Sequence, residues 1–282
     1  MLLAPLVPSA SAQALKPFKD DLFRYPGVLF AEADGTYAVV DYDKMRDIHQ
    51  RDQVPERRVK GAYIRTGVRR LQNDLVLRTA AGDVRHFAVG RTKGARFIVV
   101  YLHGKGGSRR QGVDDFTFGG NFNRIKNLAA ENGGLYLSPD FPDFEDGGAA
   151  RIEALIGHYA EASPGAKVYV ACGSMGGGIC WRLANDAATS SRLGGLLLLG
   201  SYWDETFLAS AAYRSKVPIY FGHGSDDTVF PVDKQEAFFR QIRAKSPGYP
   251  ARFVRFETGS HGTPIRMTDW RETLNWMMAA AP

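Results

Sequence analysis

Hydrophobic and polar residues follow two patterns along this chain, and the pattern changes near residue 97. Before that point, short apolar runs are separated by turn sequences: 28–30 and 37–40 flank Asp34-Gly35, and 75–79 and 84–89 flank Ala81-Gly82-Asp83. Turn residues of this kind between hydrophobic runs favour β-hairpins. The first third of the chain is therefore predicted to be antiparallel β-structure.

From residue 97 onward, buried-type strand runs alternate with segments of helical periodicity. The predicted strands are 97–102, 135–137, 168–170, 196–199, 217–221 and 252–256. The predicted helices are 122–132, 148–162, 177–188, 205–214, 232–245 and 264–279. This alternation predicts a parallel sheet with helices on both faces. Right-handed crossovers then bring the loops that follow the strands to one edge of the sheet, where ligands bind.

The composition is that of an ordinary globular protein, with 44% hydrophobic and 23% charged residues among 282. The longest apolar runs, 97–102 and 196–199, are too short to span a bilayer, so we expect no transmembrane segment. The chain is predicted to comprise a signal-peptide remnant (1–12), a β-rich N-terminal extension (13–71) and an α/β catalytic domain (72–282).

The net charge is +6, and basic residues cluster at 51–58 and 65–70. Acidic residues interrupt the first cluster, and no nucleic-acid-binding motif accompanies either one. We therefore expect a solvated basic face and no nucleic-acid partner.

The first twelve residues resemble the end of a secretory signal, because Ala10-Ser11-Ala12 fits the small-residue rule for cleavage. A basic segment before the apolar stretch is missing. The sequence thus predicts a periplasmic or secreted protein, with a cytoplasmic one as the alternative.

Ser174 lies in the most informative segment, where the strand-like run Val168-Tyr169-Val170 gives way to small residues and then to a helix. A serine on such a tight strand-to-helix turn needs small residues two positions to either side. Those residues are Cys172 and Gly176, so the pattern is C-x-S-x-G rather than G-x-S-x-G. The alternative is a glycine-rich turn without chemistry; a phosphate-binding P-loop does not fit, because no lysine follows these glycines.

The chain has two cysteines, Cys172 and Cys180. Cys172 lies on the predicted strand, and a rise of about 1.5 Å per helical residue places Cys180 about 9 Å further along, which argues against a disulfide between them. We expect both to be buried as small hydrophobic residues. No cysteine or histidine spacing typical of zinc is present, so we expect neither a metal nor a cofactor.

Three further loops at the predicted sheet edge contain polar residues. They are His103-Gly104-Lys105-Gly106-Gly107, Gly222-His223-Gly224-Ser225-Asp226-Asp227-Thr228 and Gly259-Ser260-His261-Gly262. Serine, aspartate and histidine thus follow different strands of one sheet in that order. With the serine turn, these segments resemble the α/β-hydrolase superfamily over residues 72–280, most closely its carboxylesterase, dienelactone-hydrolase-like and phospholipase/carboxylesterase group. The resemblance implies an α/β-hydrolase fold, here with an antiparallel N-terminal β extension.

The resemblance also implies a role for each residue. Ser174 would be the nucleophile, His261 the base and Asp227 the acid, with Asp226 and Asp204 as alternatives for the acid. Histidine titrates near neutrality and can accept the serine proton, and a carboxylate orients the imidazole. An oxyanion would be held by the backbone N–H of Met175 and by one from the loop 104–107, at Lys105 or Gly106. His103 and His223 are expected to brace their loops.

These residues predict a serine hydrolase that cleaves small or medium soluble carboxylic esters through an acyl-enzyme. Tyr202, Trp203 and the loop 140–148 would shape the acyl pocket or merely pack, and Lys105, Arg109 and Arg110 would favour an anionic substrate or remain solvated. One alternative is an amide or thioester hydrolase or an acyltransferase with the same residues. The other is a non-catalytic binding protein with a hydrolase fold.

Overall fold

The computed structural model describes residues 14–53 and 57–280, and a ten-stranded sheet runs through this part of the chain. The strand order is β1-β2-β12-β11-β10-β9-β7-β8-β6-β5. All neighbours from β2 to β8 in this order pair in parallel, whereas β1, β6 and β5 are antiparallel to their neighbours.

The strands of this sheet are β1 (Val28–Ala31), β2 (Tyr37–Val40), β5 (Gln72–Leu77), β6 (Val84–Gly90), β7 (Phe97–Leu102), β8 (Leu135–Pro139), β9 (Lys167–Gly173), β10 (Leu193–Leu199), β11 (Ile219–Gly224) and β12 (Ala251–Phe256). A separate two-stranded ribbon is formed by β3 (Asp52–Gln53) and β4 (Arg58–Val59). The α-helices are α1 (Asp20–Phe23), α2 (Asn121–Glu131), α3 (Asp146–Glu161), α4 (Gly177–Asn185), α5 (Ala187–Ser190), α6 (Ala211–Arg214), α7 (Val232–Lys245), α8 (Thr263–Met267) and α9 (Trp270–Ala280).

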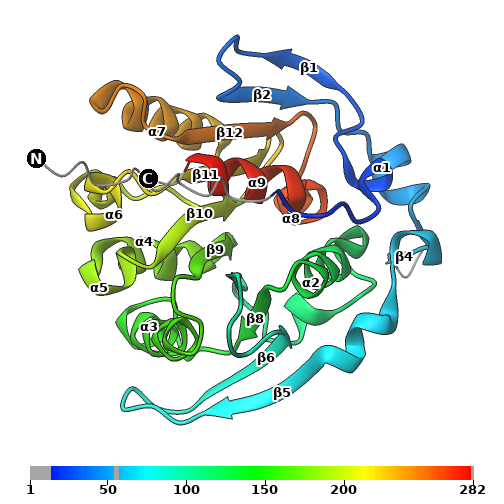
Figure 1. The fold of residues 1–282 in the computed structure, drawn as a ribbon. Coiled ribbons are helices and arrows are strands. Elements are labelled where there is room, and N and C mark those ends of the chain that lie inside the picture. The colour runs from blue at the N-terminus through cyan, green and yellow to red at the C-terminus, as the bar shows by residue number, and fades with distance from the viewer. Residues whose placement is uncertain (1–13, 54–56, 281–282) are drawn as a thin grey trace, which may run out of the picture.

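Helices cover both faces of the sheet (Figure 1). One buried cluster joins α3, α4 and α7 to one face, and a second joins α2, α8 and α9 to the other. The central strand β7 is buried at every position, and an uninterrupted apolar run of this kind is typical of a parallel strand covered on both sides. The predicted parallel sheet and its helical layers are confirmed.

The two predicted hairpins form, β1 with β2 and β5 with β6, and they lie at opposite ends of the sheet. The predicted antiparallel strands of the N-terminal part are confirmed, and β2 pairs in addition with β12, in parallel. Tyr37 of β2 stacks on Phe253 of β12 with ring centroids 5.6 Å apart, so this edge gains apolar contact from a strand distant in sequence. The division at residue 71 stays a prediction, and the expected signal remnant 1–12 lies outside the described residues.

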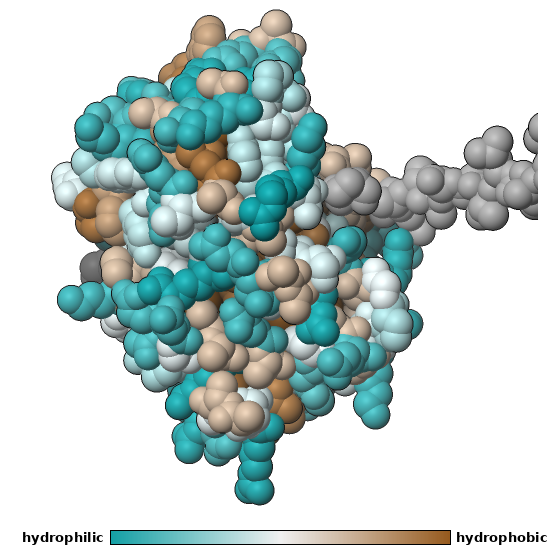
Figure 2. Space-filling model, turned by 90° about the vertical axis from the view of Figure 1, so that its left-hand side faces the viewer, coloured by the Kyte–Doolittle hydropathy of each residue, from teal (hydrophilic) through white to brown (hydrophobic). Residues whose placement is uncertain are grey.

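Figure 2 shows one face of the molecule, on which hydrophilic residues predominate and hydrophobic ones form only small patches. In the described part of the chain, no helix combines the length and apolar character needed to cross a membrane.

The basic cluster 51–58 was predicted to be solvated. This prediction was wrong for Arg51, which is only 6% exposed. Its guanidinium lies 4.6 Å from the ring centroid of Tyr63 and donates to the Gly119 carbonyl at 2.9 Å. The aromatic face and the carbonyl replace part of the water that this cation loses.

Candidate active site

Ser174 lies at the carboxyl end of β9, on a sharp turn into the 3₁₀ segment Ser174–Gly176 and helix α4. Its φ is +51°, a strained value for a residue with a side chain. The backbone around it leaves no room for side chains: a Cβ on Gly176 would lie 2.7 Å from the Leu102 carbonyl oxygen, and one on Gly104 would lie 2.8 Å from Cβ of Ser174. The turn therefore presents the Ser174 hydroxyl at the predicted edge of the sheet.

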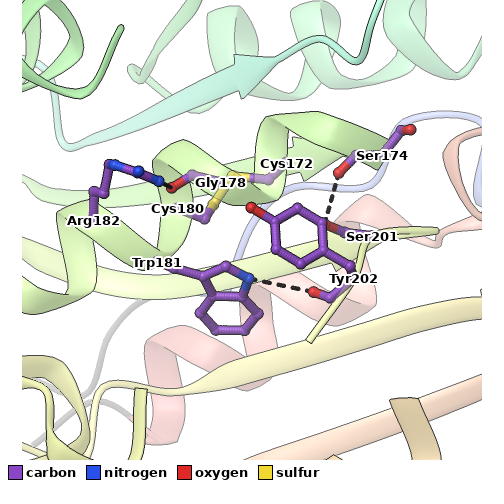
Figure 3. The surroundings of a disulfide bond; sticks show 8 residues. All are labelled: Cys172, Ser174, Gly178, Cys180, Trp181, Arg182, Ser201 and Tyr202. Carbon is purple, nitrogen blue, oxygen red and sulfur yellow. Dashed lines mark hydrogen bonds between the residues drawn. A yellow bond between two sulfur atoms is a disulfide. The ribbon is translucent and has the colours of Figure 1, made fainter. Parts of the chain in front are cut away.

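Cys172 and Cys180 form a disulfide, so the prediction of two unpaired cysteines was wrong (Figure 3). The prediction counted the rise along a helix, but the chain reverses at Ser174, and α4 runs back beside β9. The two Cα atoms are consequently only 6.4 Å apart, within the range that a disulfide spans. The bond thus joins the strand before Ser174 to the helix after it, both cysteines being fully buried.

Ser201, which the sequence analysis did not single out, supports the same turn from the end of β10. Its hydroxyl donates to the Ser174 carbonyl oxygen at 2.7 Å, and the residue is fully buried (Figure 3). The neighbouring Tyr202 accepts a hydrogen bond from Trp181 Nε1 through its carbonyl and packs against the core. No sequence pattern marks Ser201, because its partner is a backbone atom 27 positions away.

The structure brings Ser174, His261 and Asp227 together in one hydrogen-bonded chain. Nε2 of His261 lies 2.9 Å from Oγ of Ser174, and Nδ1 lies 2.8 Å from Oδ2 of Asp227. A carboxylate can only accept, so Nδ1 carries the proton and Nε2 is left to accept the serine proton. This is the arrangement that a neutral histidine needs to act as a base toward a hydroxyl.

Asp226 and Asp204, the two alternative candidates for the acid, form hydrogen bonds within their own turns. Asp226 accepts from the hydroxyl of Ser225 at 3.2 Å, and Asp204 accepts from the backbone N–H and the hydroxyl of Thr206. Of the three candidates, only Asp227 is hydrogen-bonded to His261.

The side chain of Asp227 is fully buried, and that burial raises the pKa of its carboxyl group. Hydrogen bonds from His223 and His261, and from the backbone N–H groups of Phe230 and Val229, outweigh this effect and hold the pKa well below its usual range. The carboxylate is consequently ionised at neutral pH and available to stabilise a positive imidazole.

The two histidines expected to brace loops do form such contacts. His223 Nε2 donates to the Phe230 carbonyl at 2.8 Å, and it also lies 3.3 Å from Oδ2 of Asp227, a contact that the sequence analysis missed. His103 Nδ1 lies 2.9 Å from the Gly104 carbonyl oxygen, and its ring stacks on Phe141 of the loop 140–148. Phe141 therefore packs on the loop that follows β7.

A cavity of about 160 Å³ opens beside Ser174. Its lining residues are Gly104, Lys105, Gln111, Phe118, Ser174, His261, Gly262 and Ile265.

Two of the predicted oxyanion residues, Lys105 and Gly106, lie in the loop after β7, where Gly106 has a positive φ of +77°. The third, Met175, directly follows Ser174 on the turn. Arg109 instead forms ion pairs with Asp74 and Asp140, so its charge is already compensated.

Metal-ligating side chains do not gather in this site: among residues 14–53 and 57–280, no three His, Cys, Asp or Glu residues lie close enough to hold a metal ion.

No protein-family model and no curated protein matches this sequence. Solved structures do match it. One is a thermostable esterase, 15% identical, with a TM-score of 0.59 over 75% of this chain and 63% of the esterase. Another is an α/β serine hydrolase homologue from Coxiella burnetii, 17% identical, with a TM-score of 0.53 over 72% of this chain and 95% of that one.

A third is a protein of unknown function from Agrobacterium tumefaciens, described as a putative α/β hydrolase. It is 15% identical, with a TM-score of 0.57 over 72% of this chain and 93% of that one. Identities this low establish a shared fold and leave activity open. The strand order, the turn at Ser174 and these structural likenesses together show that the chain has the α/β-hydrolase fold.

Proposed function

We propose that this protein is a serine hydrolase that cleaves carboxylic esters of small or medium soluble substrates. The observation that carries the proposal is the chain of hydrogen bonds from Ser174 through His261 to Asp227, with distances of 2.9 and 2.8 Å. These three side chains come from three different loops, and they meet at a strained turn beside a cavity. Strained backbone of this kind is concentrated at active sites.

The reaction begins when Oγ of Ser174 attacks the ester carbonyl carbon while Nε2 of His261 takes the hydroxyl proton. The carbonyl oxygen becomes an oxyanion, which the N–H of Met175 and the N–H of Lys105 or Gly106 stabilise. Asp227 keeps the imidazole in the required tautomer and stabilises its positive charge.

His261 then returns the proton to the leaving alkoxide, so an alcohol departs and the acyl group stays on Ser174. A water molecule then takes the place of the serine hydroxyl. His261 takes a proton from the water, and the resulting hydroxide attacks the acyl carbon. The carboxylic acid leaves as His261 returns the proton to Oγ of Ser174.

The substrate range is inferred from the surroundings of the cavity. Between β10 and β11, the described chain forms only the short 3₁₀ helix Glu205–Ala209 and α6, so no long helical cap is inserted at this point. An uncapped site of this size suits small or medium soluble esters.

The test is intact-mass analysis after treatment with a fluorophosphonate, together with turnover of 4-nitrophenyl butanoate. We expect one covalent adduct on the parent protein and none on Ser174→Ala, with ester turnover lost in the variant. Ser191→Ala is the matched control, because Ser191 is an exposed serine whose hydroxyl donates to the Ala188 carbonyl of the helix just before it. An adduct that persists in Ser174→Ala, or undiminished turnover, contradicts the proposal. Comparing the butanoate ester with the butanoyl anilide separates esterase from amidase activity.

A further inference from the structure

A second and larger cavity, of about 270 Å³, adjoins the one at Ser174. The two cavities have Phe118 and Gly262 in common in their linings, so they meet at these two residues. The second cavity is lined by Tyr42, Ile48, Arg57, Thr117, Phe118, Ser260, Gly262, Thr263 and Arg266. Ser260 and Gly262 flank His261 in sequence, which places this space directly beside the base.

One wall of the second cavity comes from the N-terminal segment. Tyr42 follows β2, Ile48 lies in the helical turn Met45–His49, and Arg57 directly precedes β4. The Tyr42 ring, Ile48 and Phe118 give this space an apolar surface that an alkyl or aryl group would fill. The N-terminal segment thus builds part of the space that a bound ester would occupy.

The charges around the two cavities are not balanced. Arg266 is compensated, because its guanidinium donates to both carboxylate oxygens of the buried Asp52. Neither Arg57 nor Lys105, which lines the cavity at Ser174, forms an ion pair with a carboxylate of residues 14–53 and 57–280. No aspartate or glutamate from this part of the chain belongs to either lining.

The Tyr42 hydroxyl lies among charged groups of both signs. Burial and the charge of Asp47 raise its pKa, a hydrogen bond from Thr263 and the charges of Arg266 and Arg57 lower it, and the pKa is raised overall.

We propose that the substrate is an ester with a carboxylate at one end, whose apolar body fills the cavity beside Ile48 and Phe118 and whose carboxylate pairs with Arg57. This inference rests on the proposed serine-hydrolase function and adds to it the substrate class. The carboxylate takes no part in bond making or breaking; it binds the guanidinium while Ser174 and His261 act on the ester group.

The test compares matched pairs of esters that differ in one terminal carboxylate. In one pair the carboxylate is on the acyl part: mono-4-nitrophenyl adipate against 4-nitrophenyl hexanoate. In the other it is on the alcohol part: the butanoate ester of 4-hydroxybenzoate against phenyl butanoate. We expect kcat/KM to favour the charged ester in one pair, and this preference to fall about tenfold in Arg57→Gln, as for the loss of one charge-assisted hydrogen bond.

Arg58→Gln is the matched control, because it removes the same charge one residue further along. The Arg58 guanidinium lies 4.0 Å from the ring centroid of Phe116, and the residue is absent from both linings. An equal fall in Arg58→Gln reveals a general surface-charge effect and overturns the inference. So does a preference that Arg57→Gln leaves unchanged in both pairs, in which case turnover of the neutral esters shows that the hydrolase function stands. If no ester is turned over and no fluorophosphonate adduct forms, the proposed function fails and the inference falls with it.

Discussion

Asp227 receives hydrogen bonds on both of its carboxylate oxygens. Oδ1 accepts from the backbone N–H groups of Val229 and Phe230 at 2.8 and 3.0 Å, and Oδ2 accepts from His261. Nε2 of His223 lies 3.3 Å from the same Oδ2. The loop after β11 thereby holds the carboxylate in one orientation. The hydrogen bond from Nδ1 to this carboxylate in turn fixes the orientation of the His261 imidazole.

Asp227→Asn is expected to lower kcat for ester hydrolysis by about 10⁴-fold, because an amide no longer selects the tautomer with its proton on Nδ1. The measurement is steady-state turnover of 4-nitrophenyl butanoate. Asp226→Asn is the neighbouring control and should leave kcat unchanged, since Asp226 contacts Ser225 and not His261. Equal losses in the two variants would remove Asp227 from the proposed role.

At the scale of elements, the turn at Ser174 is held by β9, α4 and the disulfide that connects them. Cys172 occupies the position where a glycine is usual in such a turn, and its side chain continues into the bond with Cys180. The departure from glycine is thus accompanied by a covalent link across the turn, which limits how far the strand and helix can separate.

Removing this disulfide is expected to lower the free energy of unfolding by about 2–3 kcal/mol, from the loop entropy of a short closed segment. The comparison is urea unfolding of the parent and of the Cys172→Ala/Cys180→Ala variant, each with and without a thiol reductant. Reductant should destabilise only the parent. The reduced parent must first be shown to have free thiols. If its free energy of unfolding then equals that of the oxidised parent, the disulfide does not stabilise the fold.

At the scale of the whole molecule, a buried ionic cluster ties the N-terminal segment to the helical layer over the sheet. Asp115 lies 2.6 Å from Nζ of Lys126 on α2, accepts from Asn123, and pairs with Arg69 of the 3₁₀ helix Thr66–Leu71. Burial raises the pKa of Asp115, but its hydrogen bonds and the charge of Lys126 outweigh this, and the pKa is lowered overall. The ionised carboxylate therefore favours the folded state.

Asp115→Asn is expected to reduce the free energy of unfolding by about 3–5 kcal/mol at pH 7, because it leaves the buried Lys126 ammonium without its counter-charge. A lowered folded-state pKa means that this stabilisation is complete above the unfolded pKa, near 3.9, and declines as the pH falls. The difference in the free energy of unfolding between parent and variant should accordingly become smaller below about pH 4. Urea unfolding at several pH values measures it, with the highly exposed Asp21→Asn as control. A difference that does not depend on pH would show that the carboxylate charge is not responsible.

The pattern of apolar and polar residues was enough to predict the parallel sheet and the loops that form the candidate site. Apolar runs such as 97–102 predict buried parallel strands, and parallel strands with right-handed crossovers bring the following loops to one edge. The choice of Asp227 as the acid came from the resemblance to the α/β-hydrolase superfamily, whereas the loops that hold Ser174, Asp226, Asp227 and His261 could be grouped from the pattern of strands alone. Local spacing is sufficient for this, because strand ends and glycine turns are local features of the chain.

Other features depend on how the chain packs in three dimensions, and the sequence pattern did not reveal them. The reversal of the chain at Ser174 brings Cys172 and Cys180 within bonding range, which a count of residues along a helix does not reveal. The parallel pairing of β2 with β12 and the cavity wall formed by Ile48 and Arg57 have the same origin. Such contacts leave no periodic signal, since each partner's sequence is compatible with many neighbours until the chain is packed.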